Sequence, residues 1–265
     1  MTAPSRAYVL RPVARPRATH RLICVPWSGA GPGVFNRWAR EMPGEVELLA
    51  VVLPRSTAWR GEDGEFTVDK IAERLAYDLT TRYGEVEWLG VFGHSLGALI
   101  AYDLAARLQG QQVRLDGVIV SGSRAAHCDP PVQLHELDDE GLADALIELG
   151  GLAMDRRYDT IFLDRVLPRV RADLIACERY RPAATLPRLG PAVRLTAWAA
   201  NSDWYAPPAA VAPWSELAHH GHATARTWAG DHFFVRDFSA DMVLAALGWP
   251  HGTVHPDTTV LERAA

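Results

Sequence analysis

The sequence predicts an α/β protein with a mostly parallel, doubly wound sheet and right-handed crossovers. Apolar runs of strand length alternate with segments of helical period along most of the chain, a pattern typical of βαβ units. One run enters a Gly-x-Ser-x-Gly turn at Gly93–Gly97 and continues as a helix. Only between Arg124 and Leu189 do helical patterns follow one another without a clear strand. We therefore expect residues 1–265 to form a single domain with a helical insertion.

Length, composition and charge favour an ordinary globular enzyme. The 265 residues suffice for one large domain, which at this size buries roughly three quarters of the surface of its unfolded chain. A net charge of −5 without a basic cluster argues against a nucleic-acid partner. Lys70 is the only lysine among 27 basic residues. Because the arginines are spread along the whole chain, we interpret this skew as coding bias.

We expect a cytoplasmic protein with no signal peptide and no membrane span. Met1–Thr19 carries arginines and prolines but no apolar core, and no apolar run approaches the length of a span. The cysteines Cys24, Cys128 and Cys177 are widely spaced and lack a C-x-x-C pair, which favours a reducing compartment with inert thiols. We expect a mobile tail from Trp249 onward.

Apolar periodicity predicts the elements of the first part of the chain. Val46–Leu53 is almost continuously apolar, as expected of a parallel strand covered on both faces. Thr67 is a candidate N-cap for the amphipathic segment that follows it. In chain order we expect a strand at His20–Pro26, a helix at Val34–Glu41, a strand at Val46–Leu53, a polar loop at Arg55–Glu65 and a helix at Thr67–Tyr83.

The second part of the chain continues the alternation around the insertion. Within the insertion we expect helices at Asp138–Leu149 and Thr160–Tyr180, the latter kinked or divided at Pro168. A lid over the sheet is the usual role of such a segment, and ordinary crossover helices are the alternative. Outside it we expect strands at Trp88–Phe92, Leu115–Val120, Ala192–Ala199 and Thr224–Trp228, and helices ending at Leu108 and spanning Ala209–His219 and Phe238–Leu247.

The turn Gly93-His-Ser-Leu-Gly97 carries the main chemical signal. A Gly-x-Ser-x-Gly match between a strand and a helix is the nucleophile elbow of the α/β-hydrolase fold. Small residues on both sides of Ser95 let the strand and the helix pack closely, and the sharp turn exposes the hydroxyl at the sheet edge. The alternative is a glycine-rich β–α turn with an incidental serine. Partners for Ser95 decide between the two.

A serine nucleophile needs a base, and the base needs a carboxylate that orients it. In this fold they follow the serine in the order acid, then histidine, each on a loop after a strand. Asp203 and His232 occupy such loops in that order, so we predict Ser95, Asp203 and His232 as the catalytic triad. Asp231 is a weaker acid candidate because neighbouring side chains diverge, and we expect His94 to be structural.

Two further features have competing interpretations. The amide of Leu96 and a second amide after the first strand are expected to form an oxyanion hole. We favour Ser28 for the second donor, with Trp27 as the rival, although the glycines that follow also suit a simple flexible turn. The cluster His219, His220 and His222 suggests a metal site, but no Cys or Glu arrangement accompanies it. We therefore expect a solvated surface patch and no metal.

With these residues in place, the chain resembles type II thioesterases that accompany polyketide synthases and nonribosomal peptide synthetases. The resemblance extends from about Arg21 to Leu247. Its first and last motifs are more specific than a general hydrolase signature. It rests on Val25-Pro-Trp-Ser-Gly-Ala-Gly31 with Phe35 and Trp38, Gly93–Gly97, Ser121-Gly-Ser-Arg124, Leu134-His-Glu-Leu137, Arg171-Ala-Asp173 with Tyr180, and Gly230-Asp-His-Phe-Phe234.

The resemblance implies a serine thioesterase that releases acyl groups from the phosphopantetheine arm of acyl or peptidyl carrier proteins. It implies the same triad and the same two oxyanion donors. The insertion from about His127 to Pro187 would be a lid that shapes an acyl channel. No cofactor of its own is implied, because the phosphopantetheine belongs to the substrate, and we expect a monomer.

The sequence departs from the family pattern at two places, and two other functions are alternatives. The family's usual Leu-Pro-Gly-Arg-Glu run is replaced by Leu53-Pro-Arg-Ser-Thr-Ala-Trp59, which puts the role of this loop in doubt. Trp204 and Tyr205 beside the acid are bulky and suit a narrowed acyl pocket. A small-ester hydrolase or an acyltransferase of the same fold is the enzymatic alternative. A binding module of this fold that has lost catalysis is the alternative outside enzymes.

Overall fold

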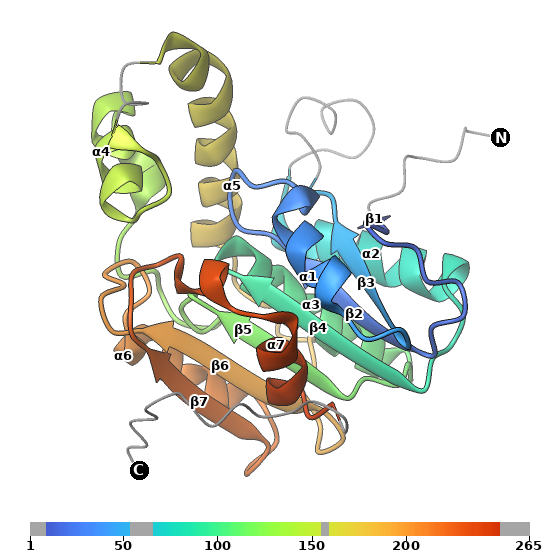
Figure 1. The fold of residues 1–265 in the computed structure, drawn as a ribbon. Helices are drawn as coiled ribbons and strands as arrows, with labels where there is room; N and C mark the ends of the chain where they lie inside the picture. The colour runs from blue at the N-terminus through green and yellow to red at the C-terminus, as the bar shows by residue number, and fades with distance from the viewer. Residues whose placement is uncertain (1–8, 54–65, 155–158, 250–265) are drawn as a thin grey trace, which may run out of the picture.

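The computed structural model describes residues 9–53, 66–154 and 159–249, and the Arg55–Trp59 loop lies outside these ranges. A seven-stranded sheet in the order β1-β3-β2-β4-β5-β6-β7 forms the centre of the molecule (Figure 1). Every neighbouring pair is parallel except β1 with β3. The predicted mostly parallel α/β architecture is confirmed. The strands are β1 (Val9–Leu10), β2 (His20–Val25), β3 (Val46–Val51), β4 (Trp88–His94), β5 (Gly117–Ser121), β6 (Arg194–Ala200) and β7 (Ala223–Trp228).

Helices cover both faces of the sheet because its inner strands are buried on both sides. One face packs on α1 (Asn36–Glu41) and α7 (Ala240–Ala246), and its core includes Phe92 and Trp198. The other face packs on α2 (Val68–Arg82) and α3 (Leu96–Gly110). Short helical turns η1 (Pro32–Phe35), η6 (Ala212–Leu217) and η7 (Phe234–Asp237), together with α6 (Pro208–Val211), complete the two layers.

Residues between β5 and β6 form the helical insertion. Its described part contains η3 (Leu134–Glu136), α4 (Asp139–Glu148), the π-helical turn η5 (Phe162–Val166) and α5 (Leu167–Arg179), and no strand. In Figure 1, α4 and α5 rise above the body of the molecule. Pro168 lies in the first turn of α5, directly after the π-helical turn. Because proline has no N–H to donate, the regular helical hydrogen bonding changes at this residue.

Buried polar groups fix the C-terminal end of α5 to the sheet domain. The Arg124 guanidinium, which follows β5, donates to the backbone carbonyls of Cys177 and Tyr180 at 3.1 and 2.9 Å. The Tyr180 hydroxyl donates to Oδ2 of Asp103 on α3 at 2.6 Å. The buried Arg124 guanidinium and Tyr180 hydroxyl therefore both have partners, as buried polar groups require. The motifs containing Arg124 and Tyr180 thus serve to anchor the insertion.

Three local expectations differ from the structure. β1 was not expected, and it adds two antiparallel residues at the sheet edge. The helix expected at Ala209–His219 is a short α6 followed by the 3-10 turn η6, because Pro213 interrupts α-helical bonding. Residues 250–265 of the tail expected from Trp249 onward lie outside the described ranges, and the expectation is wrong for Trp249. Trp249 is buried and packs edge-on against Trp88, with ring centroids 5.6 Å apart.

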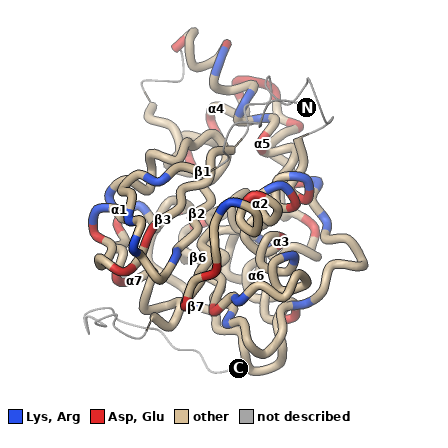
Figure 2. Tube along the Cα trace, turned by 90° about the vertical axis from the view of Figure 1, so that its right-hand side faces the viewer, with Lys and Arg blue, Asp and Glu red and all other residues tan. Residues whose placement is uncertain are grey.

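Charged residues of both signs are spread over the molecule, as the sequence indicated (Figure 2). Basic and acidic positions are interspersed over the helices in the view of Figure 2. Within the described ranges, no helix has both the length and the apolar character needed to cross a membrane.

All three cysteines are free. Burial raises the pKa of the Cys24 thiol, and it raises the pKa of Cys177 to about 12, so both remain protonated thiols at neutral pH.

Candidate active site

Ser95 lies at the sharp turn between β4 and α3. Its backbone has φ +56° and ψ −120°, a strained conformation that residues with a side chain rarely adopt. A Cβ on Gly93 would overlap the Gly97 carbonyl, and a Cβ on Gly97 would overlap the Val25 carbonyl oxygen. Both glycines are therefore required by the close approach of helix to strand. The turn has the geometry of a nucleophile elbow.

Asp203 and His232 form a buried pair on the loops after β6 and β7. Nδ1 of His232 lies 2.7 Å from Oδ2 of Asp203, and the two side chains are 0% and 3% exposed for Asp203 and His232 respectively. The other carboxylate oxygen, Oδ1, accepts the backbone N–H groups of Tyr205 and Ala206 at 3.0 and 2.9 Å. These donors fix the carboxylate, and the carboxylate fixes the imidazole. We assign the proton to Nδ1, which leaves the Nε2 lone pair free to act as a base.

The structure places Ser95, Asp203 and His232 along one edge of the sheet. The strands β4 to β7 are parallel neighbours, so the loops at their carboxyl ends meet at the same edge. The ring of His94, the residue before Ser95, lies 5.1 Å from the His232 ring between centroids. His232 therefore lies beside the elbow that carries Ser95, and Asp203 is paired with Nδ1 of its ring.

The rival acid and base have other partners. Oδ1 of Asp231 accepts the N–H of Phe233 at 2.8 Å, a bond within its own turn. His94 is fully buried, and its Nδ1 lies 3.0 Å from Oγ of Ser121. Burial lowers the pKa of His94 well below its usual value, and the neighbouring His232 lowers it further. His94 is therefore a neutral ring that supports the elbow.

The histidine cluster lies at the turn before β7. His219, His220 and His222 are all exposed. The His219 and His222 rings contact each other in a T-shaped arrangement, with centroids 5.3 Å apart. Within the part of the chain that the structure describes, no group of three or more His, Cys, Asp or Glu side chains is arranged to hold a metal ion.

The loop after β2 supplies candidate oxyanion donors next to the start of α3. The close approach of Gly97 to the carbonyls of Val25 and Pro26 places this loop against the helix end that carries the Leu96 amide. The next two amides in the loop are already used: Gly29 N–H donates to Asp173, and Ala30 N–H donates to the Trp27 carbonyl at 3.0 Å. Among the described residues, Trp27 and Ser28 amides donate no backbone hydrogen bond. Both remain available as donors.

An apolar cluster covers the candidate triad. It joins side chains of the insertion to Tyr205 and Phe233, which adjoin Asp203 and His232, and Trp27 and Trp204 pack at its margin. Trp204 is partly exposed, whereas Tyr205 is buried. These bulky residues therefore form the wall between the triad loops and the insertion. The insertion contributes Leu134, Leu142, Ala145, Leu149, Leu167, Val170 and Leu174 to the cluster.

A buried polar network behind the acid was missed from sequence. The Tyr205 hydroxyl donates to Oε1 of Glu178 on α5 at 3.1 Å. Oε2 of Glu178 pairs with Nδ1 of His135, and the Leu134 N–H donates to Oε1 at 3.0 Å. Because Tyr205 N–H also donates to Asp203, the network links the insertion to the acid. Its sequence signal was the Leu134–Leu137 motif, which the resemblance quoted without a role.

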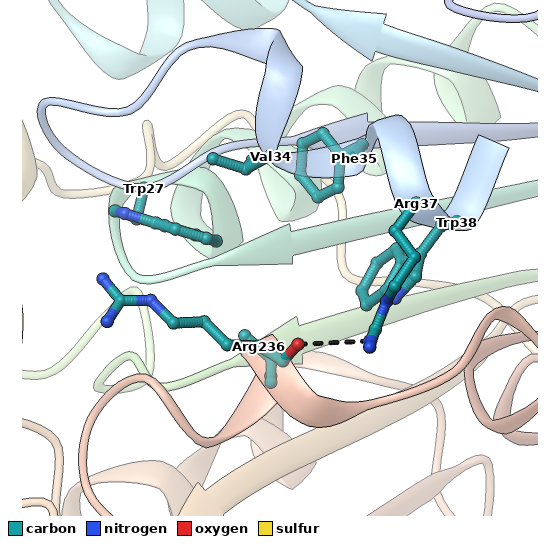
Figure 3. A pocket seen from close by; sticks show the side chains of 7 residues that line it. Trp27, Val34, Phe35, Arg37, Trp38 and Arg236 are labelled. Carbon is teal, nitrogen blue, oxygen red and sulfur yellow. Dashed lines mark hydrogen bonds between the residues drawn. The ribbon is translucent and has the colours of Figure 1, made fainter. Parts of the chain in front are cut away.

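A small pocket lies between the loop after β2 and α1. It encloses about 260 Å³ and is lined mainly by the side chains shown in Figure 3. The Arg236 guanidinium lies 4.1 Å from the Phe233 ring centroid and 5.7 Å from that of Trp27, distances typical of cation–π contacts. It also donates to the Gly150 carbonyl of the insertion at 2.9 Å. Arg236 thus connects the His232 loop, the loop after β2 and the insertion.

Comparison with known proteins identifies the family. The sequence profile described as the thioesterase domain matches residues 20–247. The chain belongs to the thioesterase family. A curated relative of this thioesterase, Thioesterase PikA5 of Streptomyces venezuelae, is 33% identical over 263 residues, which cover 94% of this chain and 90% of the relative. The predicted thioester hydrolase and its resemblance to type II thioesterases are confirmed.

Solved structures agree in fold. RedJ, a thioesterase from the prodiginine biosynthetic pathway in Streptomyces coelicolor, is 34% identical, has a TM-score of 0.75 and covers 93% of this chain and 96% of its own. YbtT, a type II thioesterase from the yersiniabactin NRPS/PKS biosynthetic pathway, is 25% identical, has a TM-score of 0.78 and covers 93% and 99%. The thioesterase described here therefore has the α/β-hydrolase fold predicted from its sequence.

Proposed function

We propose that this thioesterase hydrolyses acyl groups from the phosphopantetheine arms of acyl or peptidyl carrier proteins and so clears stalled or misprimed synthases. The observation that carries the chemistry is the buried Asp203–His232 pair, 2.7 Å apart, beside the strained Ser95 elbow. The similarity to PikA5, RedJ and YbtT supports the substrate class, since the last two are named for biosynthetic pathways.

The first half of the proposed reaction forms an acyl-enzyme. Nε2 of His232 takes the proton of the Ser95 hydroxyl while Oγ attacks the thioester carbonyl carbon. The amides of Leu96 and Ser28 donate to the oxygen that becomes negatively charged. When the tetrahedral intermediate collapses, the C–S bond breaks and the imidazolium protonates the departing thiolate. Asp203 stabilises the imidazolium and keeps its ring oriented.

The second half releases the acid. His232, again neutral, removes a proton from a water molecule, and the hydroxide attacks the ester carbonyl on Ser95. The same two amides hold the second oxyanion. Collapse breaks the bond to Oγ, which takes back the proton from His232, so the enzyme returns to its starting state and a free carboxylic acid leaves.

The partner is proposed to be a carrier protein, and the enzyme is proposed to act as a monomer without a cofactor of its own. The thiol that leaves is the end of the carrier's phosphopantetheine, so the arm is part of the substrate. We propose that the insertion, residues 127–187, forms the lid of the acyl channel. Its apolar residues Leu142, Leu149 and Leu174 belong to the cluster that includes Tyr205 and Phe233, and such side chains suit an alkyl chain.

Acyl release from loaded carrier proteins tests this function. Carrier proteins loaded with acyl groups of different length and α-branching are incubated with the enzyme, and the products are identified by mass. Free acid with regenerated carrier thiol is expected. Simple oxyesters cleaved far faster than acyl carriers, or transfer of the acyl group to an alcohol or amine, would instead show a small-ester hydrolase or an acyltransferase.

Ser95→Ala is the matched control for the chemistry. Loss of the nucleophile is expected to reduce acyl release on the order of 10⁶-fold, by analogy with serine proteases. Retention of a tenth of the rate contradicts the assignment of Ser95. Labelling with a fluorophosphonate probe followed by peptide mapping checks the same residue directly. A wild-type protein that leaves Ser95 unlabelled would favour a binding module without catalysis.

A further inference from the structure

Asp173 is a buried carboxylate that the catalytic scheme does not use. It lies on α5, is 2% exposed, and is surrounded along its helix by Val170, Leu174 and Cys177. Its Oδ2 accepts the backbone N–H of Gly29 at 2.7 Å. Gly29 directly follows Ser28 in the loop that carries the proposed oxyanion donor. A carboxylate in such a position costs solvation free energy, and a specific hydrogen bond to a backbone donor offsets that cost.

The same helix also contacts the loop through packing. Gly29 has φ +75°, and a Cβ at this position would lie 2.8 Å from Cγ2 of Val170. The Ala30 N–H donates to the Trp27 carbonyl at 3.0 Å, which closes a four-residue turn with Gly29 in its third position. A positive φ at the third position is typical of a type II turn. α5 thus holds this turn by one hydrogen bond, and Val170 leaves no room for a side chain at Gly29.

We propose that Asp173 is a positioning residue for the oxyanion hole. By holding the Gly29 N–H, it fixes the turn from Trp27 to Ala30 and so directs the preceding amide toward the carbonyl oxygen of the substrate. This inference deepens the proposed function, since it concerns the same site. Oxyanion donors are effective because they are oriented before charge develops, and the Asp173 carboxylate supplies that orientation from the insertion.

The contacts around Asp173 indicate which protonation state does this. Burial raises the pKa of Asp173 to about 6, and the Gly29 hydrogen bond and the charge of Arg169 on the same helix oppose that rise. Cys177, one turn further along α5, remains a neutral thiol because burial raises its pKa to about 12. Above pH 6 the carboxylate is charged and accepts the Gly29 N–H strongly. Below pH 6 the neutral carboxyl is a weaker acceptor.

The test measures transition-state affinity in Asp173→Asn and Asp173→Ala. An alkylboronic acid adds reversibly to a catalytic serine as a tetrahedral anion, so its inhibition constant reports the oxyanion hole. Loss of a whole oxyanion donor costs on the order of 10²–10³-fold. Loss of its support is therefore expected to weaken boronate binding about 10- to 100-fold in Asp173→Ala. With a small acyl-thiol substrate, kcat should fall by a similar factor while KM changes less than about threefold.

Asp103→Asn is the matched control. Asp103 is also buried, at 1% exposure, and it also ties α5 to the sheet domain through Tyr180, but it does not contact the oxyanion loop. Its variant is expected to lower Tm without changing boronate affinity. Equal boronate affinity in the wild type and both Asp173 variants overturns the proposal, as does an equal loss in Asp103→Asn.

A second measurement isolates the charge of Asp173. The ratio of kcat/KM between wild type and Asp173→Asn cancels the titration of His232, which both enzymes share. The ratio is expected to fall as the pH drops below 6 and to reach a plateau above pH 7. A ratio that is flat across this range contradicts a role for the carboxylate charge.

The small acyl-thiol keeps the two proposals separable. If the wild-type enzyme cleaves the acyl-thiol and binds the boronate but ignores loaded carrier proteins, the proposed substrate class fails while the role of Asp173 is still decided by the variants. If the wild-type enzyme does not bind the boronate, the oxyanion role of the loop, and with it that of Asp173, is refuted.

Discussion

His232 reaches Asp203 through Nδ1 at 2.7 Å, across 29 residues of sequence and between the ends of two neighbouring strands. The pair is almost completely buried, and the carboxylate is held by two further backbone donors. An aspartate constrained in this way acts on the tautomer of its histidine. Replacement of Asp203 by a neutral side chain therefore tests the role of this pair most directly.

Asp203→Asn is expected to retain the fold and lose about 10⁴-fold in kcat, as in serine proteases with the equivalent change. The amide can donate to Nδ1, and the imidazole then presents a protonated Nε2 to Ser95. Acyl-thiol hydrolysis at neutral pH measures the loss. Asp231→Asn is the control and should stay within a few-fold of wild type, because Asp231 bonds within its own turn. The opposite ranking of the two variants would reverse the assignment of the acid.

Gly97→Ala is expected to lower the stability of the fold. The added Cβ would overlap the carbonyl oxygen of Val25, which belongs to the neighbouring central strand and cannot move without disturbing the sheet. Overpacking of this kind costs about 1–3 kcal/mol or more. Gly110→Ala, at the end of the same helix, meets no atom within 4 Å and should change stability little. Urea unfolding of the two variants compares them, and similar midpoints would contradict the close packing at the elbow.

Tyr205→Phe is expected to cost about 1–3 kcal/mol of stability, because Oε1 of the buried Glu178 loses a donor. Activity should fall less than it does in Asp203→Asn, since the Tyr205 backbone still donates to the acid. Tyr77→Phe, on an exposed side chain, is the stability control. Equal Tm values for the two phenylalanine variants would show that the network contributes nothing.

Asp173→Asn is expected to be at least as stable as the wild type at pH 8 while being less active. The pKa of Asp173 is raised from its ordinary value of 3.8 to about 6 in the folded protein. The folded protein therefore binds a proton more tightly than the unfolded chain. The ionised group costs stability above pH 6, by an amount on the order of 3 kcal/mol, and this cost disappears as the pH falls to about 4.

Urea unfolding across this pH range measures the difference between the two proteins. The stability of the variant relative to wild type should be greatest at pH 8 and should decrease toward pH 4. A wild-type protein that is more stable than the variant at pH 8, by an amount that does not change with pH, would show that the carboxylate is retained for folding instead of function.

Thiol titration should find one reactive cysteine in the native enzyme at pH 8. Cys24 and Cys177 are buried with raised pKa values, so they present neither thiolate nor access. Cys128 is partly exposed. A disulfide reagent should therefore modify one thiol in the folded state and three in denaturant. Rapid modification of two or more thiols in the native state would contradict the burial.

The sequence was sufficient for residues whose signal is local. Ser95 lies inside a motif, and Asp203 and His232 each follow a recognisable strand, so chain order alone brought them to one edge. Asp173 lacked such a signal, because its partner Gly29 is 144 residues away and their contact depends on how α5 lies against the loop. The Arg171-Ala-Asp173 motif was quoted for the resemblance without a role, and a further hint was a carboxylate on the apolar stripe of Val170, Leu174 and Cys177.

The sequence patterns also failed to predict very short elements and contacts made outside regular elements. β1 has only two residues, which is too short for any period to be detected. Trp249 follows a glycine near the end of the chain and was placed in a tail, yet it packs against His20 and Trp88. Aromatic residues outside regular elements pack wherever the folded surface leaves room, and this depends on tertiary structure.

The junction at Pro168 divides the insertion into two parts that contact the rest of the molecule differently. After it, α5 carries Asp173 and Glu178 and ends at the anchoring Tyr180. Hydrogen bonds fix this part to Gly29 in the loop after β2, to the Tyr205 hydroxyl and to Asp103 on α3. Before it, α4 and the π-helical turn contribute side chains to an apolar cluster, and the Gly150 carbonyl that follows α4 accepts a hydrogen bond from Arg236. Exchange of α4 and the π-helical turn between relatives, with Leu134 and His135 kept, therefore offers a route to chimeric enzymes with new acyl preferences and the same contacts behind the acid.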